Sequence, residues 1–471
     1  MKINRISIYF CTISLIMMVG AMKRELTFLS ILISIFLVVA ICLEKKQSVY
    51  ICNGIVSLLI LQNFCIGVGA HLSHNSDSSL KLLTQIPFIS IFIIWFFTCV
   101  LGNTSDVSQK DKMRFVILLV CIGLSFFIGR GGVQSAVISI RNMTAFFMIY
   151  EIGAVHIKDK DGFDMFSKHI ICWGCLLCLV GIILLIGGYP LYKFIGIHEV
   201  YVAKAAPFTE GYLDYRFYTS LFSSHSYVRM GSLLYEPINL AYIFSIVFLC
   251  SLFNNPYKGM LRGVTIICNG IGLFLTFGKG GYLIAGLGVG FVFAERIFDV
   301  IRRRYGKDIL SFGILIIVFS LAFLFVKFYI DNIGLAVLNH VWGVIGTWKN
   351  VLKRPWGYGI GTGGNVAHVL GNSDLDWLSS GGETAFMSFM FQIGIQGIIA
   401  FSMCLLGLSQ NMKNRRTLFE RLFFYIPFIL LGISILQDNT FTPQCITVAM
   451  LLQGALSNKK LMKYSVESQD D

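Results

Sequence analysis

The run ETAFMSFMFQIGIQGIIAF, from Glu383 to Phe401, decides the fold class of this chain. After its first residue it carries no charged side chain, and as a helix it covers most of a hydrocarbon core that is roughly 30 Å thick. Apolar runs of this kind recur along the whole sequence, in which 56% of the residues are hydrophobic, 13% are charged and the mean hydropathy is +0.74. The sequence therefore predicts an all-α, polytopic integral membrane protein with a single membrane domain over residues 1–471.

Fourteen apolar segments are candidates for membrane-spanning helices, and we expect about 12 to 14 such helices. The segments cover residues 6–22, 27–43, 51–70, 88–102, 114–129, 133–157, 170–188, 238–253, 263–277, 281–295, 309–327, 383–407, 422–436 and 440–456. With the N-terminus in the cytoplasm, most Lys and Arg residues fall on the cytoplasmic side, as the positive-inside rule requires. Both termini are therefore predicted to be cytoplasmic, and two long outer loops cover residues 189–237 and 328–382.

The net charge of +13 would suit a nucleic-acid partner in a soluble protein. Here, however, the basic clusters Arg302–Lys307 and Lys413–Arg416 lie at the ends of apolar segments. Such clusters set the topology and contact anionic lipid, so we expect membrane lipid and no nucleic acid as a partner. The thirteen cysteines lie in apolar segments or at their edges, and neither they nor the eight histidines have the spacing of a metal site. No metal ion and no cofactor is expected.

The unequal loop lengths indicate that any chemistry takes place on the outer face of the membrane. ATP and nucleotide sugars are scarce there, so a glycosyl or phosphoryl donor would have to arrive already activated on a lipid carrier. Arg229 lies near the end of the first outer loop, and Lys279 lies between two apolar runs on the same side. Cations grip phosphate oxygens, and arginine does so in pairs, so these residues are candidate ligands of a diphosphate. Arg141, toward the outer end of its apolar run, could extend the site.

The second outer loop is predicted to contain an amphipathic helix of about 20 residues, followed by the glycine-rich segment RPWGYGIGTGG, Arg354–Gly364. The apolar residues of the helix are Leu338, Val341, Trp342, Ile345, Trp348 and Leu352. Pro355 ends this helix, which we expect to lie on the outer leaflet. Lys353 and Arg354 either bind a substrate phosphate or only extend toward lipid headgroups. The backbone around Gly359 and Gly361 is a candidate substrate loop that could hold phosphate.

Carboxylates in or beside the outer loops are candidates for handling sugar hydroxyl groups. Glu383 and Glu236 each precede an apolar run, and either could act as a general base. A carboxylate at a helix start is also favoured by the helix dipole alone, and Glu236 could merely pair with an arginine. Asp374 and Asp376 in GNSDLDW could bind sugar hydroxyls or could simply be solvated. The histidines that could contact sugar from the outer loops are His225, His340 and His368.

In their order and spacing these motifs resemble the O-antigen polymerase and ligase superfamily of bacterial membrane glycosyltransferases. The resemblance covers about residues 229–401. The positions that carry it are Arg229, Gly231, Pro237 and Asn239 at a helix start, Gly278, Lys279 and Gly280 at a turn, Pro355, Gly357, Gly359, Gly361 and Gly363 in the glycine-rich segment, and Gly394 and Gly397 in the next helix. Where the turn of the family usually has arginine, this chain has Lys279. Where the ligases have a histidine, it has Glu383 followed by Thr384, which favours the polymerase branch.

The resemblance implies a C-type glycosyltransferase embedded in the bacterial inner membrane, with its active site on the outer face. Its reaction would be polymerisation of lipid-linked oligosaccharide repeat units of an O-antigen, a capsule or an exopolysaccharide. Glycan would move from undecaprenyl diphosphate to a sugar hydroxyl of an acceptor unit, without a metal ion. Arg229 would clamp the diphosphate, Lys279 would assist, and Arg354 or Lys353 would guide the headgroup. A polysaccharide chain-length regulator is a partner that the resemblance leads us to expect.

Two other functions stay open on the sequence alone. An O-antigen ligase or a related glycan transferase would use the same lipid-linked donor with a different acceptor. A flippase or transporter of lipid-linked oligosaccharide would also need many spans and cations for the diphosphate. Such transporters usually show two similar halves, and we detect no such repeat in this sequence.

Overall fold

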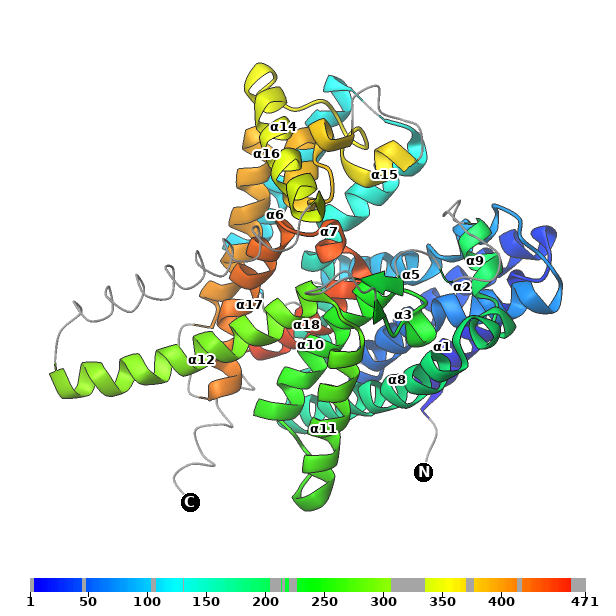
Figure 1. Cartoon of the computed structure of the whole chain (residues 1–471), viewed down its shortest axis with the longest axis horizontal. Helices are drawn as coiled ribbons and strands as arrows, with labels where there is room; N and C mark the ends of the chain where they lie inside the picture. Colours follow the sequence, from blue (N-terminus) through cyan, green and yellow to red (C-terminus); the bar gives the residue numbers. More distant parts are fainter. Residues whose placement is uncertain are drawn as a thin grey trace.

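The computed structural model of the chain describes residues 4–44, 48–102, 107–129, 131–203, 213, 217–219, 227–305, 335–369, 377–412 and 417–458. Nearly all of these residues lie in helices, as Figure 1 shows. The strands in this part of the chain form one short antiparallel pair, β1 (Tyr218–Thr219) and β2 (Tyr227–Val228). The predicted all-α architecture is therefore confirmed over the described residues.

The described residues form these helices, in order from the N-terminus. Their bounds are α1 (Arg5–Gly20), α2 (Arg24–Leu43), α3 (Val49–Leu72), α4 (Leu80–Leu83), α5 (Ile86–Trp95), η1 (Phe96–Leu101), α6 (Gln109–Ile128), α7 (Val133–His156), α8 (Lys160–Phe194), α9 (Ile197–Ala203), η3 (Ser232–Leu234), α10 (Pro237–Phe253), α11 (Gly259–Leu275), α12 (Lys279–Tyr305), α14 (Leu335–Lys353), α15 (Gly364–Val369), η4 (Trp377–Ser380), α16 (Ala385–Gln410), α17 (Leu418–Ser434), η5 (Asp438–Phe441) and α18 (Pro443–Leu456). Every apolar segment predicted from the sequence coincides with one of these helices, except 309–327, which lies outside the described residues.

Six stretches of the described chain are helical, long and apolar enough to cross a membrane. They are α2, α3, Leu80–Leu101, α8, Lys279–Ile297 in α12, and α16. The apolar helices α1, α10, α11 and α18 are shorter, at 10 to 17 residues. The structure thus shows an all-α protein with helices of membrane-spanning length, and the larger number of spans stays a prediction from the sequence.

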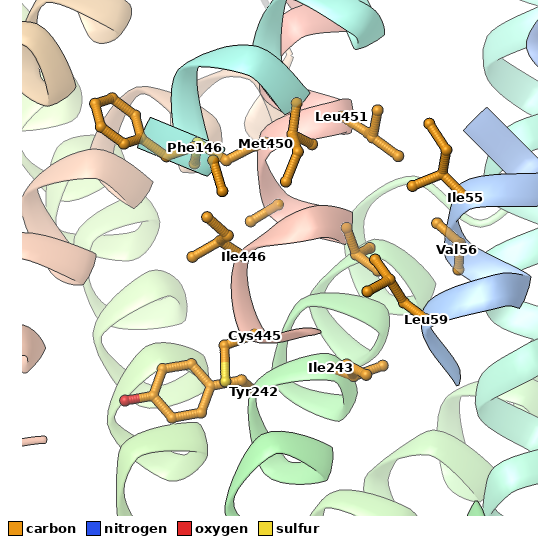
Figure 2. Close-up of a cluster of buried hydrophobic side chains, with 14 of the residues drawn as sticks. Ile55, Val56, Leu59, Phe146, Tyr242, Ile243, Cys445, Ile446, Met450 and Leu451 are labelled. Atoms are coloured by element: carbon orange, nitrogen blue, oxygen red, sulfur yellow. The ribbon is translucent and has the colours of Figure 1, made fainter. Parts of the chain in front are cut away.

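The centre of the core is α18, in which every residue apart from Gln444 is buried. Figure 2 shows side chains of α3, α7 and α10 gathered around it. A side-chain carbon at Gly454 would overlap the carbonyl oxygen of Tyr150, and one at Gly153 would overlap that of Leu451. Glycine at these positions lets α7 and α18 approach closely, which is a common device where helices pack inside a membrane.

Large apolar side chains also cover much of the outside of the molecule. Phe127 is 89% exposed, Met260 87% and Ile186 82%, and they lie on three different helices. A soluble protein rarely leaves so many large apolar residues in water, whereas lipid tails cover them at no cost. The exposed surface therefore agrees with the apolar helices in indicating a membrane protein.

Three of the helices near the candidate site, α14, α15 and α16, lie toward one edge of the bundle. Figure 1 shows α14, α15 and α16 grouped there, beside α6 and α7. α14 packs against η4 and α16, and α15 packs against η4, α16 and α7. The described part of the predicted second outer loop, residues 335–369 and 377–382, is thus folded onto the helical core.

Candidate functional site

Charged residues from distant parts of the sequence are linked by electrostatic contacts at one site. The residues, here termed the charged cluster, are Arg229, Lys279, His340, Glu383 and Asp438. His340 Nε2 lies 3.4 Å from Glu383 Oε2. The charge of Lys279 acts on His340 and Glu383, that of Arg229 acts on Lys279, and that of Asp438 acts on Glu383. The structure therefore brings together the predicted residues Arg229, Lys279 and Glu383.

Each member of the charged cluster is placed by the beginning or end of an element. Arg229 directly follows β2, and Lys279 is the first residue of α12. His340 lies in the second turn of α14, Glu383 stands just before the first turn of α16, and Asp438 opens η5. The N-terminal ends of α12 and α16 thus lie at this site. Helix N-termini carry partial positive charge, so the backbone adds to the two cations in favouring an anion here.

The turn before α12 brings Lys279 into the cluster. Phe277 adopts a positive φ of 45° in this turn. A side-chain carbon at Gly278 would overlap Ala241 of α10, and one at Gly281 would lie 2.5 Å from the carbonyl oxygen of the same residue. Only glycine allows the start of α12 to approach α10 so closely. The glycines that flank the lysine therefore have a packing role that positions its ammonium group.

Burial shifts the pKa values of Glu383 and His340 in the directions that favour the neutral form of each side chain. Burial raises the pKa of Glu383, the Asp438 carboxylate raises it further, and Lys279 offsets part of the change. Burial also lowers the pKa of His340, and the charge of Lys279 lowers it further. A carboxyl group and an imidazole shifted in these directions can share a single proton across their contact. Such a pair can accept a proton from a hydroxyl group and return it.

Glu236, the second predicted base, lies deeper in the structure. It is the N-cap residue of α10, and its side chain is buried. Its charge and that of Asp438 both act on the thiol of Cys445, near the start of α18. Close by, Asn239 donates a hydrogen bond of 2.8 Å to the side-chain oxygen of Gln444. Glu236 thus belongs to a polar group at the N-terminal ends of α10 and α18, behind the charged cluster.

The glycine-rich segment 354–364 packs tightly against α16 and the turn between α6 and α7. The amide of Gly359 donates to the carbonyl of Gln392 at 3.0 Å, and that of Gly361 donates to the Gln392 side chain at 2.7 Å. A side-chain carbon at Gly359 would overlap the carbonyl oxygen of Gly129. Both amides are thus used inside the protein in this structure, and the phosphate-binding loop stays a prediction from the sequence. These glycines serve close backbone packing.

The same segment also supports a break in α16. At Gly394 the backbone has φ 72° and ψ −174°, which interrupts the helix. Beside the break, Ile395 donates its amide to the carbonyl of Pro355 at 2.9 Å, and Tyr358 donates its amide to the carbonyl of Phe391 at 2.9 Å. The backbone groups that the kink frees are therefore satisfied by the glycine-rich segment, as an apolar environment requires.

Lys353 and Arg354 lie away from the charged cluster. Both side chains are exposed at the end of α14 and the start of the glycine-rich segment. The Arg354 guanidinium lies 5.2 Å from the ring centre of Tyr358. A helix rises about 1.5 Å per residue, so His340 and Lys353 are roughly 20 Å apart along α14. The structure thus separates these two cations from the predicted diphosphate ligands Arg229 and Lys279.

The remaining predicted site residues are Arg141 and the two aspartates of the second outer loop. Arg141 on α7 donates hydrogen bonds to Gln85 at 3.1 Å and to Asn142 at 3.2 Å, which ties it to the start of α5. Asp374 and Asp376 lie outside the described residues.

The sequence did not lead us to predict Asp438, or Asn365, whose side-chain amide donates a hydrogen bond to it. Asn365 Nδ2 donates to Asp438 Oδ2 at 3.2 Å, which links α15 to η5. Asp438 stands in the sequence QDN between the last two apolar segments. An acidic residue in such a short turn on the predicted outer side was the available signal. Its partner Asn365 carries no comparable signal, because the glycine-rich segment ahead of it has no pattern that fixes where it folds.

The family scan, the search of curated proteins and the search of solved structures each find no match to this chain. In the part of the chain that the structure describes, no group of three or more His, Cys, Asp and Glu residues could hold a metal ion.

Proposed function

We propose that the chain is a glycosyltransferase that polymerises lipid-linked oligosaccharide repeat units, with the donor glycan carried on undecaprenyl diphosphate. The observation that supports this proposal is the charged cluster, in which Arg229 and Lys279 lie beside the Glu383–His340 pair. Such a transfer needs cations for a diphosphate leaving group and an acceptor for the proton of the incoming hydroxyl. The apolar helices and apolar outer surface suit a substrate that is anchored in lipid.

In the proposed reaction the acceptor hydroxyl oxygen forms a bond to the anomeric carbon of the donor glycan. The bond between that carbon and the diphosphate oxygen breaks, and its electron pair leaves with the diphosphate. Arg229 and Lys279 stabilise the negative charge that grows on this leaving group. The hydroxyl proton passes to Glu383, which His340 contacts. Because the two cations neutralise the leaving group, the scheme uses no metal ion.

The remaining predicted residues take supporting roles in the proposal. Exposed Lys353 and Arg354 bind lipid headgroups around the site rather than the diphosphate itself. Glu236 keeps the N-terminal end of α10 polar behind the cluster, and Arg141 fixes α7 to α5. The proposal also places the protein in the bacterial inner membrane, with this site on the outer face and a chain-length regulator as a partner.

Surface glycan length tests the proposal. A bacterial strain in which the gene is deleted is complemented with wild type, Arg229→Ala or Glu383→Gln, and its glycan is resolved as a gel ladder. A polymerase leaves single repeat units on the final anchor when it is deleted. Full-length glycan stranded on the lipid carrier would instead identify a ligase. Purified protein in proteoliposomes should lengthen the glycan without any ion gradient, and relocation of substrate without transfer would identify a transporter.

A further inference from the structure

A groove of about 360 Å³ lies between α6 and α16, and its lining runs from Phe386, in the first turn of α16, to Gln410, its last residue. Its walls are apolar and include Ile398, Ile399, Met403 and Leu406 of α16, while Arg114 of α6 lies among them. Ile399 and Met403 are each more than half exposed, so the groove opens toward the surrounding lipid. A guanidinium beside an apolar, lipid-facing groove is unusual, because a charge in this environment is costly unless it has polar partners.

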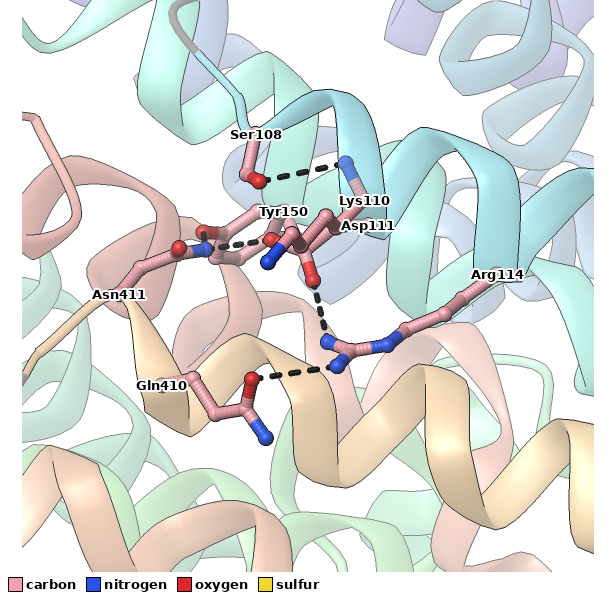
Figure 3. Close-up of polar contacts among 7 residues, drawn as sticks. All are labelled: Ser108, Lys110, Asp111, Arg114, Tyr150, Gln410 and Asn411. Carbon is pink, nitrogen blue, oxygen red and sulfur yellow. Dashed lines mark hydrogen bonds and ion pairs between the residues drawn. The ribbon is translucent and has the colours of Figure 1, made fainter.

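Polar contacts hold the Arg114 side chain in position, as Figure 3 shows. Its Nη1 donates to Asp111 Oδ1 at 2.7 Å, and its Nη2 donates to Gln410 Oε1 at 3.1 Å. The second oxygen of Asp111 accepts a hydrogen bond of 2.6 Å from Asn411, which also donates to the Tyr150 hydroxyl at 3.0 Å. A guanidinium carries five N–H donors, and the contacts among described residues use two of them. The remaining donors can serve an outside anion.

Gly407 leaves space for the Arg114 side chain, and two lysines precede Arg114 in the sequence. A side-chain carbon at Gly407 would overlap Arg114 Nη1, so glycine there allows the guanidinium to lie against α16. The stretch QKDKMR at residues 109–114 holds Lys110, Lys112 and Arg114 but only one acid, Asp111. The sequence segment that ends at Arg114 therefore keeps net positive charge after the Arg114–Asp111 ion pair is formed.

We propose that this groove binds an anionic phospholipid, with the phosphate at Arg114 and one acyl chain along the apolar wall of α16. An acyl chain needs a lipid-facing apolar groove, and a phosphate diester needs a fixed cation at its end, which are the two features found together here. Gln410 is the last residue of α16, whereas Glu383 precedes its first. The phosphate position at Arg114 and the charged cluster are thus associated with opposite ends of this helix, and the inference does not rest on the proposed enzymatic function.

Native mass spectrometry of the purified full-length protein tests the lipid site. The protein in detergent is titrated with phosphatidylglycerol and with phosphatidylcholine of the same acyl chains. We expect phosphatidylglycerol to bind with about fivefold or greater preference, because charge-assisted hydrogen bonds favour its anionic headgroup. Met403→Trp fills the groove and should abolish this binding, whereas Leu179→Trp, at an equally exposed position on α8, should leave it unchanged.

A second variant tests the contribution of charge. Arg114→Gln should reduce the preference for phosphatidylglycerol. Arg114→Lys should keep part of it, since the lysine ammonium retains the charge but cannot bind two phosphate oxygens at once as a guanidinium does. Equal binding of the two phospholipids to wild type would overturn the proposal, as would unchanged binding of phosphatidylglycerol by Met403→Trp. Displacement of bound phosphatidylglycerol by equimolar undecaprenyl phosphate would also overturn it and would assign the groove to a polyprenyl chain.

Discussion

The contact between Glu383 and His340 decides which proton chemistry is available at the charged cluster. At 3.4 Å the two groups can exchange a proton, and burial disfavours the charged form of each. A carboxyl group with a raised pKa is a stronger base once it is ionised, and it can release its proton again after each turnover. This property distinguishes Glu383 from a carboxylate that merely interacts with a helix dipole.

The raised pKa of Glu383 predicts a pH dependence for both stability and activity. The folded protein holds this proton more tightly than the unfolded chain, so the contribution of Glu383 to stability is greatest at low pH and is lost as the pH rises through the raised pKa. We therefore expect Glu383→Gln to unfold at a higher temperature than wild type at neutral pH and at a similar temperature in acid. Thermal unfolding in detergent at several pH values measures this difference.

Activity should respond in the opposite sense to stability. A base must be ionised, so transfer by wild type should increase as the pH rises through the raised pKa of Glu383, and Glu383→Gln should lose about 100-fold or more of the rate. Glu25→Gln, in the first turn of α2, is the matched control and should keep the wild-type profile. A stabilised but fully active Glu383→Gln variant would remove this residue from the proton transfer.

Arg229 gives a graded prediction, because arginine and lysine bind a diphosphate differently. Arg229→Ala should reduce polymerisation by about 100-fold or more while the protein still inserts in the membrane, and Arg229→Lys should recover only part of the loss. Lys279→Arg should be tolerated. Repeat-unit transfer by the purified variants measures these effects, and Lys258→Ala, ahead of α11, is a control that should be neutral. Normal chain lengths from Arg229→Ala would exclude it as a diphosphate ligand.

At the scale of single residues, part of the candidate site could be predicted from the sequence. Residue type and position pointed to Arg229, Lys279 and Glu383, because a cation or an acid beside an apolar run requires a polar partner. The sequence also grouped Lys353 with them, although a helix of fixed length holds it away from His340. Asp438 could not be assigned to the cluster, since nothing in its local sequence specifies that η5 lies beside α15.

At the scale of elements, hydropathy predicted where helices form but not how they bend. The run that begins at Ala385 is mostly apolar and has no charged residue, so its pattern indicates one continuous helix, whereas the backbone breaks at Gly394. The break depends on the glycine-rich segment. Its backbone amides donate hydrogen bonds to carbonyl groups of α16 that, in a continuous helix, would accept from amides of the next turn. α14 was predicted more fully, because its three- and four-residue apolar spacing and the following Pro355 define both its type and its end.

The close packing of the glycine-rich segment predicts that its glycines cannot be replaced. Gly359→Ala would place a methyl group against Gly129 at a φ of 104°, so we expect the protein to lose about 1 to 3 kcal/mol of stability and to accumulate poorly. Gly263→Ala is the control, because a side chain there meets open space on α11 and alanine favours a helix by about 1 kcal/mol. Thermal unfolding of the two variants in detergent makes the comparison. Equal stability would mean that the segment moves away from Gly129 at little cost.

At the scale of the whole molecule, the packing of the helices constrains which helix ends lie on the same side of the membrane. The charged cluster joins the beginnings of α12 and α16 with η5, the turn that precedes α18. Arg114, in contrast, contacts the last residue of α16. A helix of 26 residues is about 39 Å long if it is straight, which exceeds a hydrocarbon core of roughly 30 Å. α16 can therefore place Glu383 and Gln410 at opposite faces even with its kink.

This geometry, together with the positive-inside rule, predicts the sidedness of the chain. Alkaline phosphatase, which folds only outside the cytoplasm, should be active when it is fused after Ser379 and inactive when it is fused after Met412. Green fluorescent protein, which fluoresces in the cytoplasm, should give the reverse result at the same two positions. The basic run Lys413–Arg416 follows Met412, so in a fusion placed after Leu418, which retains the run, replacing its three cations with Gln should weaken retention on the cytoplasmic side. Activity of both phosphatase fusions would show that α16 does not cross the membrane, and the proposed site would then lose its separation from the groove at Arg114.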